Sequence, residues 1–181
     1  MKRIITITLI LLVSACSMQA PPYNASLENV QTIKRAKIEP IKVGSITTTK
    51  KLNSISLRGS SMLSPVNKSY GDYISQALED ELRLAKLWSP VSSTIITGQV
   101  LTNDIDVSGF SEGSGEISAN FIVTKNNKII FEKTISANHT FDSSFIGAIA
   151  IPNGQANYVN LVQKLIKNLF ENKDFVTAVK S

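Results

Sequence analysis

One long stretch of the chain, residues 94–141, alternates apolar and polar side chains, and this pattern restricts the fold more than any other. In its middle part, apolar side chains occupy every second position between polar ones, apart from Ile122: Ile117, Ala119, Phe121 and Val123. Such alternation is typical of β-strands with one buried face. Asn126 and Asn127 suit a two-residue hairpin turn, because Asn tolerates the positive φ that such turns require. We therefore expect three strands here, joined as an antiparallel meander.

The first of these strands, over residues 94–107, divides its large aliphatic side chains between two faces. With a strict two-residue period, Leu101 and Ile105 lie on one face. Ile96 and Val100 lie on the other. The Gly- and Ser-rich residues 108–115 are then expected to turn the chain back toward the second strand.

Two other segments carry the period of an α-helix. After Ser69, apolar residues recur at the i, i+3, i+4 spacing, which predicts a helix over residues 73–88. Ser69 and Asp72 resemble a capping box with Asp in the place of Glu, and Pro90 ends the pattern. A second stripe with the same period predicts a helix over residues 158–170.

A strand beginning near Pro40 precedes the first helix, since Ile41 and Val43 alternate with polar or small residues in the manner of a half-buried edge strand. Elements that each have one apolar face must cover one another. We expect an α+β fold of order β-α-β-β-β-α, with two helices on one face of a mostly antiparallel sheet of four to five strands. A single domain is expected over residues 40–181.

The N-terminal residues have the order of a secretory signal. Lys2 and Arg3 give a positive start, residues 4–13 form an apolar run, and the small residues Ser14 and Ala15 follow. A membrane-spanning helix needs about 20 apolar residues, so this run is too short to remain as a permanent span. We predict a signal peptide over residues 1–15.

Cys16, the one cysteine of the chain, follows this signal directly. Val13-Ser14-Ala15-Cys16 resembles the lipobox of bacterial lipoproteins. The resemblance implies removal of the signal before Cys16, transfer of a diacylglyceryl group to its thiol and acylation of the new amine by a fatty acid such as palmitate. Ser17 stands where Asp often marks retention in the inner membrane, so the resemblance implies a Gram-negative outer-membrane lipoprotein that faces the periplasm.

Residues 16–39 are predicted to form a flexible tether after the lipidated cysteine, because they contain Pro21-Pro22 and few large apolar side chains. Lys34, Arg35 and Lys37 form a basic cluster in this segment. Two interpretations stay open for the cluster: contact with anionic headgroups beside the anchor, or a solvated linker, which we favour.

The charge of the chain does not indicate a nucleic-acid partner. Removing Lys2 and Arg3 with the signal lowers the formal net charge from +5 to +3. A nearly neutral, exported domain lacks the basic surface that nucleic-acid binding requires. The predicted partners are the membrane, through the lipid anchor, and a protein of the cell envelope.

No set of side chains in the sequence assembles into a known catalytic or metal site. Asp104 and Asp106 share one side of a strand but lack further oxygen ligands, so they are expected to be exposed. Residues 109–113 match the letters of the G-x-S-x-G nucleophile elbow, yet they precede a strand instead of a helix. His139 lies on an apolar strand face, where a packed residue is the expected role. We expect no enzyme activity, no metal and no cofactor.

One uncharged segment, residues 145–151, connects the last strand to the second helix. Its large apolar side chains are the candidate interaction surface: Phe145, Ile146, Ile149 and Ile151. We expect the segment to be core, because Gly147 and Ala148 suit close packing, and an exposed docking surface is the alternative. The loop over residues 58–68 is a second candidate.

The lipobox, the tether and the β-α-β-β-β-α pattern are together similar to several small Gram-negative lipoproteins, and residues 69–175, with the two helices and the meander, carry the likeness. These are the YajG-type lipoproteins, the auxiliary lipoproteins of ABC-type transport systems and the LPS-assembly lipoprotein. The resemblance implies an accessory or assembly protein that acts through protein–protein contacts in the envelope. The alternative is a module that binds envelope lipids or glycans in a cleft between helix and sheet.

Overall fold

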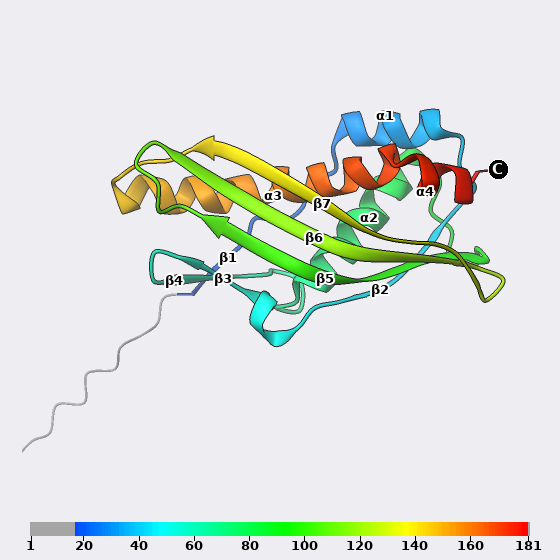
Figure 1. Ribbon diagram of the computed structural model, residues 1–181, viewed down its shortest axis with the longest axis horizontal. Helices are drawn as coiled ribbons and strands as arrows, with labels where there is room; N and C mark the ends of the chain where they lie inside the picture. The colour runs from blue at the N-terminus through cyan, green and yellow to red at the C-terminus, as the bar shows by residue number, and fades with distance from the viewer. Residues whose placement is uncertain (1–16, 181) are drawn as a thin grey trace, which may run out of the picture.

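The predicted meander forms the centre of the structure, a computed structural model that describes residues 17–180 (Figure 1). Its strands are β5 (Thr94–Asp106), β6 (Glu112–Lys125) and β7 (Lys128–Asp142), paired antiparallel in sequence order. Asn126 and Asn127 form the turn between β6 and β7 with φ values of 50° and 63°, as predicted. The α+β fold class is therefore confirmed.

The sheet around the meander is mixed. The edge strand β2 (Lys42–Thr47) pairs parallel to β5, which gives the order β2-β5-β6-β7. A parallel pair needs a crossover connection, and the chain between β2 and β5 provides one. This connection contains the 3-10 helix η1 (Lys50–Asn53), two short strands and a helix.

The predicted division of β5 into two apolar faces is wrong because the strand contains a bulge. The pairing of β5 with β6 shifts by one residue between Val100 and Thr102. A one-residue shift moves all later side chains to the opposite face. Ile96, Val100 and Ile105 are consequently buried together, whereas Leu101, at the bulge, is exposed.

A second, three-stranded sheet lies beside the first. Its order is β1 (Ser17–Gln19), β4 (Ser60–Leu63), β3 (Ser54–Leu57), with β1 parallel to β4 and β3 antiparallel to it. The predicted loop 58–68 thus contains a strand. Arg58 and Gly59 make the β3–β4 turn with φ values of 48° and 88°, and glycine adopts such a backbone without strain.

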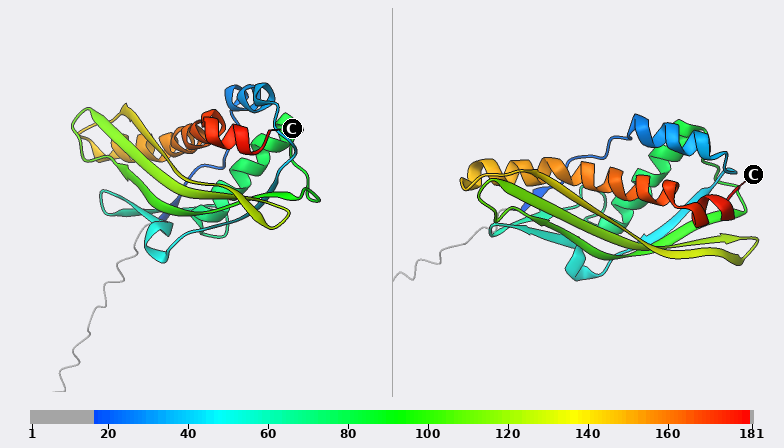
Figure 2. Two further views of the ribbon diagram at one scale, coloured as in Figure 1. Left: turned by 45° about the vertical axis from the view of Figure 1, so that its right-hand side comes forward. Right: turned by 45° about the horizontal axis from the view of Figure 1, so that its top comes forward.

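Two long helices, α2 (Tyr70–Ala85) and α3 (Gly147–Glu171), cover one face of the four-stranded sheet, as predicted (Figure 2). Ser69 caps α2 as predicted, because its Oγ accepts a hydrogen bond from the backbone N–H of Asp72. The short helix α4 (Lys173–Ala178) follows α3 and buries Phe175.

Helix α3 begins eleven residues before the predicted start at residue 158, at Gly147. Pro152 lies in its second turn, where the missing N–H costs one helical hydrogen bond. Gly154 compensates by allowing close packing, since a Cβ there would lie 2.5 Å from a methyl group of Val107. Proline and glycine therefore do not end this helix, because its early turns pack on β5.

The predicted flexible tether is wrong for residues 17–39. This segment contains β1 and the helix α1 (Leu27–Ala36), which Ser26 caps. Val30 and Ile33, on the inner face of α1, are buried, with no more than 6% of either residue exposed. A helical stripe of two large aliphatic residues is short, but it suffices here because α2 and α3 lie against it.

A buried carboxylate fixes the segment before α1 to the domain. Glu81 of α2 is fully buried, and its Oε1 accepts hydrogen bonds from Tyr23 Oη at 2.6 Å, Ser26 N at 2.9 Å and Asn29 Nδ2 at 3.2 Å. Burial raises the pKa of the Glu81 carboxyl, although these three hydrogen bonds oppose the change. The N-terminal segment is consequently part of the folded domain.

Candidate functional site

The segment predicted as an interaction surface lies at the start of α3. Phe145, Ile146 and Ile149 are 71%, 55% and 48% exposed, and Ile151 is half-buried against the core. The expectation that this segment is core is therefore wrong for Phe145, Ile146 and Ile149. In the first turn of α3 only Ala150 faces the core, so helical geometry directs the other side chains outward.

Phe110, which the sequence did not single out, extends this exposed apolar surface. It lies in the loop between β5 and β6 and is 80% exposed. Its ring stacks on the ring of Phe145, with the centroids 5.9 Å apart and the planes inclined by 10°. We call Phe110, Phe145, Ile146 and Ile149 the apolar tip. A lone aromatic residue in a Gly- and Ser-rich loop was the available signal.

Arg58 connects the loops that carry the apolar tip. Its guanidinium donates hydrogen bonds to the carbonyl oxygens of Phe145 at 2.7 Å, Ser144 at 2.9 Å and Gly109 at 3.3 Å. Its Nε also donates to the carbonyl oxygen of Val107 at 2.8 Å. One side chain from the β3–β4 turn thus holds the β5–β6 loop and the β7–α3 loop in fixed positions, as the planar fork of arginine allows.

The first described residue lies at the same end of the molecule as the apolar tip (Figures 1 and 2). Ser17 is paired with Ser61, next to the turn that contains Arg58. Gln155 of α3 donates a hydrogen bond to the carbonyl oxygen of Gln19, which joins β1 to the helix. The predicted lipidation site, Cys16, lies outside the described residues but precedes Ser17 directly in the chain.

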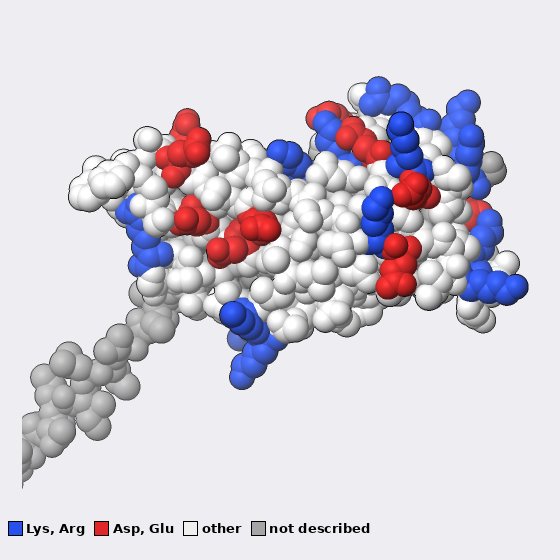
Figure 3. Space-filling view, in the orientation of Figure 1, with Lys and Arg blue, Asp and Glu red and all other residues white. Residues whose placement is uncertain are grey.

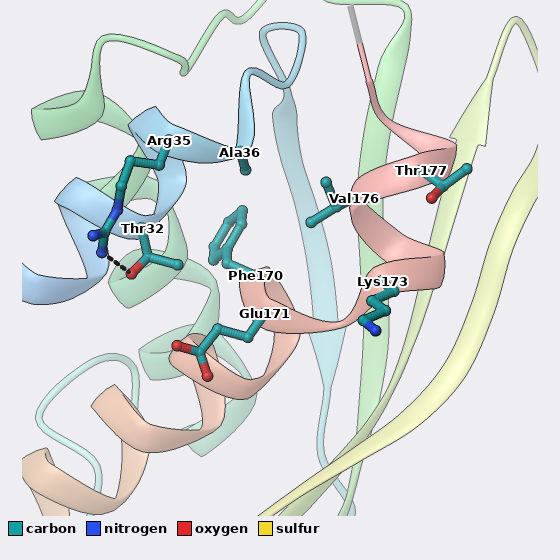
Figure 4. Close-up of a pocket in the computed structure, with 8 residues that line it drawn as sticks. All are labelled: Thr32, Arg35, Ala36, Phe170, Glu171, Lys173, Val176 and Thr177. Carbon is teal, nitrogen blue, oxygen red and sulfur yellow. Dashed lines mark hydrogen bonds between the residues drawn. The ribbon is translucent and has the colours of Figure 1, made fainter.

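The opposite end of the molecule carries a shallow groove between α1 and the C-terminal helices (Figure 4). The groove has a volume of about 560 Å³. Phe170, Ala36 and Val176 line its apolar part, and the charged side chains Arg35 and Lys173 lie at its edges. This combination of an apolar floor and a charged rim is typical of surfaces that bind other proteins.

The charged side chains also gather near the groove, as Figure 3 shows for one face of the molecule. The predicted basic cluster belongs to this end, since Lys34 and Arg35 lie in the last turn of α1 and Lys37 ends the helix. Ile38, which follows, forms a bridge with Lys180 near the C-terminus. The cluster is therefore remote from Ser17, which contradicts contact with headgroups beside the anchor.

The residues considered for catalysis lie in ordinary structural positions. Strand β6 follows residues 109–111, as expected, and His139 Nε2 is 3.0 Å from Asn157 Oδ1. Asp104 and Asp106 are exposed on the outer face of β5. Hydrogen bonds from the Ser108 side chain and N–H lower the pKa of the Asp106 carboxyl.

Two further observations concern residues 17–180 as a whole. Within this range, no group of three or more His, Cys, Asp or Glu side chains is placed to hold a metal ion. None of the helices described there combines the length and the hydropathy needed to cross a membrane.

Neither a family model nor a curated protein matches the chain. Among solved structures, a protein of the DUF330 family from Xanthomonas campestris matches with a TM-score of 0.55 and 9% sequence identity. The match covers 83% of this chain and 92% of that protein. At this identity the match shows a shared fold alone.

Two other solved structures match with lower TM-scores. A Caulobacter crescentus protein described as a lipoprotein has a TM-score of 0.46 and 14% identity, over 83% of this chain and 93% of its own. The minor lipoprotein from Acinetobacter baumannii has a TM-score of 0.43 and 11% identity, over 76% of this chain and 92% of its own.

Proposed function

We propose that this protein is a lipid-anchored lipoprotein of the Gram-negative outer membrane, which faces the periplasm and acts as an accessory or assembly subunit by binding an envelope protein. The observation that carries the proposal is that the predicted anchor and the groove belong to opposite ends of the folded domain. The chain leaves the domain toward Cys16 at one end, and the groove between α1 and the C-terminal helices opens at the other. An anchor at Cys16 would present this groove to the periplasm.

The groove suits a protein segment better than a small ligand. It is open and shallow, and its apolar floor at Phe170 and Val176 is flanked by Arg35 and Lys173. Interfaces between proteins combine an apolar centre with a polar rim in this way.

The space between the helices and the sheet is filled by side chains. Tyr70 and Tyr73 of α2 contact Tyr158 of α3, with ring centroids 4.9 Å and 5.6 Å from that of Tyr158. All three are fully buried, and Tyr158 Oη donates a hydrogen bond to Asn103 Oδ1 at 2.9 Å. The alternative function, lipid or glycan binding in a helix–sheet cleft, has no such observation in its favour.

Site-specific photocrosslinking in the native cells tests the proposal. A crosslinking amino acid at Thr177, an exposed residue of the groove, should capture one envelope protein. The matched control is Thr140, which is also exposed but lies near the end of β7 that is opposite to the groove. The same set of adducts from both positions, or no adduct from Thr177, would contradict partner binding at the groove.

The anchor is tested separately. Cys16→Ala should abolish labelling of the full chain by a fatty-acid probe and release the protein from the membrane fraction. Unchanged labelling would refute lipidation at Cys16.

A further inference from the structure

The distance between the anchor and the folded domain is very short. Ser17 is already paired in β1, so Cys16 lies one residue from the edge of the domain. One residue of extended chain spans at most about 3.6 Å. Lipid attached to the Cys16 thiol would therefore hold the surface around β1 against the headgroups instead of letting the domain stand away from the membrane.

The apolar tip lies beside this attachment point. Because β1 is parallel to β4, its first residue, Ser17, lies opposite Ser61, at the beginning of β4 that follows the turn at Arg58. The Arg58 guanidinium in that turn is bonded to the carbonyl oxygens of Gly109 and Phe145. A continuous set of backbone and side-chain hydrogen bonds thus links the anchor end to the residues of the tip.

The chemistry of the tip suits the interface of a bilayer. All four of its side chains are apolar and uncharged, and two of them are aromatic. Exposed apolar residues of this kind insert into the boundary between headgroups and acyl chains, because this removes their apolar surface from water. Arg58 is exposed beside the tip, but its N–H groups donate to backbone carbonyl oxygens, so it adds no unsatisfied hydrogen-bond donor to this surface.

We infer that Phe110, Phe145, Ile146 and Ile149 insert into the outer part of the bilayer that holds the Cys16 lipid and form a second, non-covalent membrane contact. This inference rests on the proposed lipid anchor, which determines the face of the domain that meets the membrane. The bilayer is the favoured occupant because the short junction at Ser17 brings the tip to the headgroups. The tip and the lipid together would fix the orientation of the domain.

A partition experiment measures the contribution of the tip. The chain from Cys16 onward contains every described element, and its one cysteine can be coupled to a single myristoyl chain through a maleimide. One such chain binds membranes only marginally, with an association constant of about 10⁴ per molar, so additional contacts become measurable. Binding to sucrose-loaded vesicles of phosphatidylethanolamine and phosphatidylglycerol is then measured by sedimentation.

The variant Phe145→Ser/Ile149→Ser should bind these vesicles at least about tenfold more weakly than the unaltered chain, because it loses two inserted apolar side chains. The matched control is Leu84→Ser/Val91→Ser, which removes two apolar side chains that are 55% and 89% exposed but outside the tip. It should bind like the unaltered chain. Circular dichroism verifies that both variants are folded, which the exposure of all four positions favours.

Equal binding by the tip variant and the unaltered chain would overturn the inference. An equal loss in the control would overturn it as well, because the affinity would then come from general surface hydropathy. Sedimentation of the lipid-free chain tests whether the tip binds a second copy of the chain. Self-association that the tip variant abolishes would assign the tip to that contact and contradict insertion.

A spectroscopic measurement places the tip relative to the acyl chains. Phe145→Trp is measured in the same coupled form, and the unaltered chain gives the fluorescence of Trp88 alone. The fluorescence that the new Trp adds should be mostly quenched in vesicles that contain brominated acyl chains. An unquenched Trp at position 145 contradicts insertion even where the natural anchor is established. Because the coupling is chemical, failure of Cys16 lipidation in cells leaves this measurement valid.

Discussion

The two ends of α3 differ in the way each is held and in what each exposes. At its N-terminal end, Phe145 and Ile146 just before the helix and Ile149 in its first turn are exposed beside Phe110, and the loops there are positioned by hydrogen bonds from a single arginine. Its last turn, at Phe170, lies in the groove between α1 and α4, among buried apolar side chains and surface ion pairs.

This difference shows that apolar side chains have different tasks at the two ends. At the groove end, Ile33 and Phe170 are buried and stabilise the contact of α1 with the long helices. At the tip, residues of the same kind are exposed and contribute little to the folded state. A large apolar residue that a protein leaves in water is more informative about binding than one in the core.

The largest expected difference in the free energy of unfolding is between substitutions of two isoleucines, Ile33 and Ile149. Ile33→Ala should lower the free energy of unfolding by about 2–5 kcal/mol, since Ile33 is fully buried on the inner face of α1. Ile149→Ala, at the exposed tip, should change it by less than about 0.5 kcal/mol. Urea denaturation followed by circular dichroism compares the two, and equal losses would contradict the distinction between the ends.

A smaller effect is expected from Arg58, whose guanidinium bonds four backbone carbonyls. Arg58→Ala should lower the free energy of unfolding by about 1–3 kcal/mol. It should also accelerate hydrogen exchange in residues 107–111 and 143–147, while exchange in α1 stays unchanged. Arg58→Lys is the control, because its single ammonium group can retain only some of the four hydrogen bonds to backbone carbonyls. Uniform acceleration across the chain would argue against a local role.

The attachment of α1 should depend on pH through Glu81. Burial raises the folded-state pKa of its carboxyl above the ordinary value of 4.5. The folded state then binds the proton more tightly than the unfolded state, so stability is lowest above the folded pKa and rises as the pH falls toward 4.5. Asp80 has a raised pKa as well, for the same reason, and titrates alongside.

The Glu81 contribution is isolated by the difference between the parent chain and Glu81→Gln. The amide oxygen of Gln can still accept from Tyr23, Ser26 and Asn29, while the carboxylate charge is removed. We expect thermal unfolding of this variant to lose the part of the pH dependence that Glu81 causes. An identical pH profile for both proteins would mean that Glu81 does not titrate with folding.

The smallest effect is expected at the surface near the groove. Lys133 and Asp174 form an ion pair at 3.0 Å, but both side chains are largely exposed. Such pairs contribute about 0–1 kcal/mol and are screened by salt. Lys133→Ala should therefore change the unfolding midpoint little at moderate salt, and a large loss would show that α4 depends on this pair.

The parts of the fold that the sequence predicted depend on local chemistry. The Asn126-Asn127 turn, the alternation in β6 and the Ser69 cap each follow from residues adjacent in the chain. The docking of α1 could not be predicted in the same way, because it depends on Glu81, which is 55 positions after Ser26. The bulge at Leu101 is set by pairing with β6 and leaves no clear mark on the sequence of β5.

The candidate site, like the fold, could be predicted only where residues adjacent in the chain determine it. The uncharged run around Phe145 drew attention to three residues of the tip, but their exposure depends on where α3 begins. Phe110 joins them only because the β5–β6 loop and the β7–α3 loop meet, which Ser143 secures by donating a backbone hydrogen bond to Ser111. The groove combines side chains from α1, α3 and α4, so no single segment could indicate it.

Helix α3 also determines how far from the bilayer the protein could act. It has 25 residues, which corresponds to about 37 Å along its axis. With its first turn in the headgroups, as inferred for the tip, a stiff helix would hold Phe170 and the groove at a nearly constant height above the membrane. A partner would then have to present its binding segment at that height, and its search for the groove would be a lateral one, within a thin layer parallel to the bilayer.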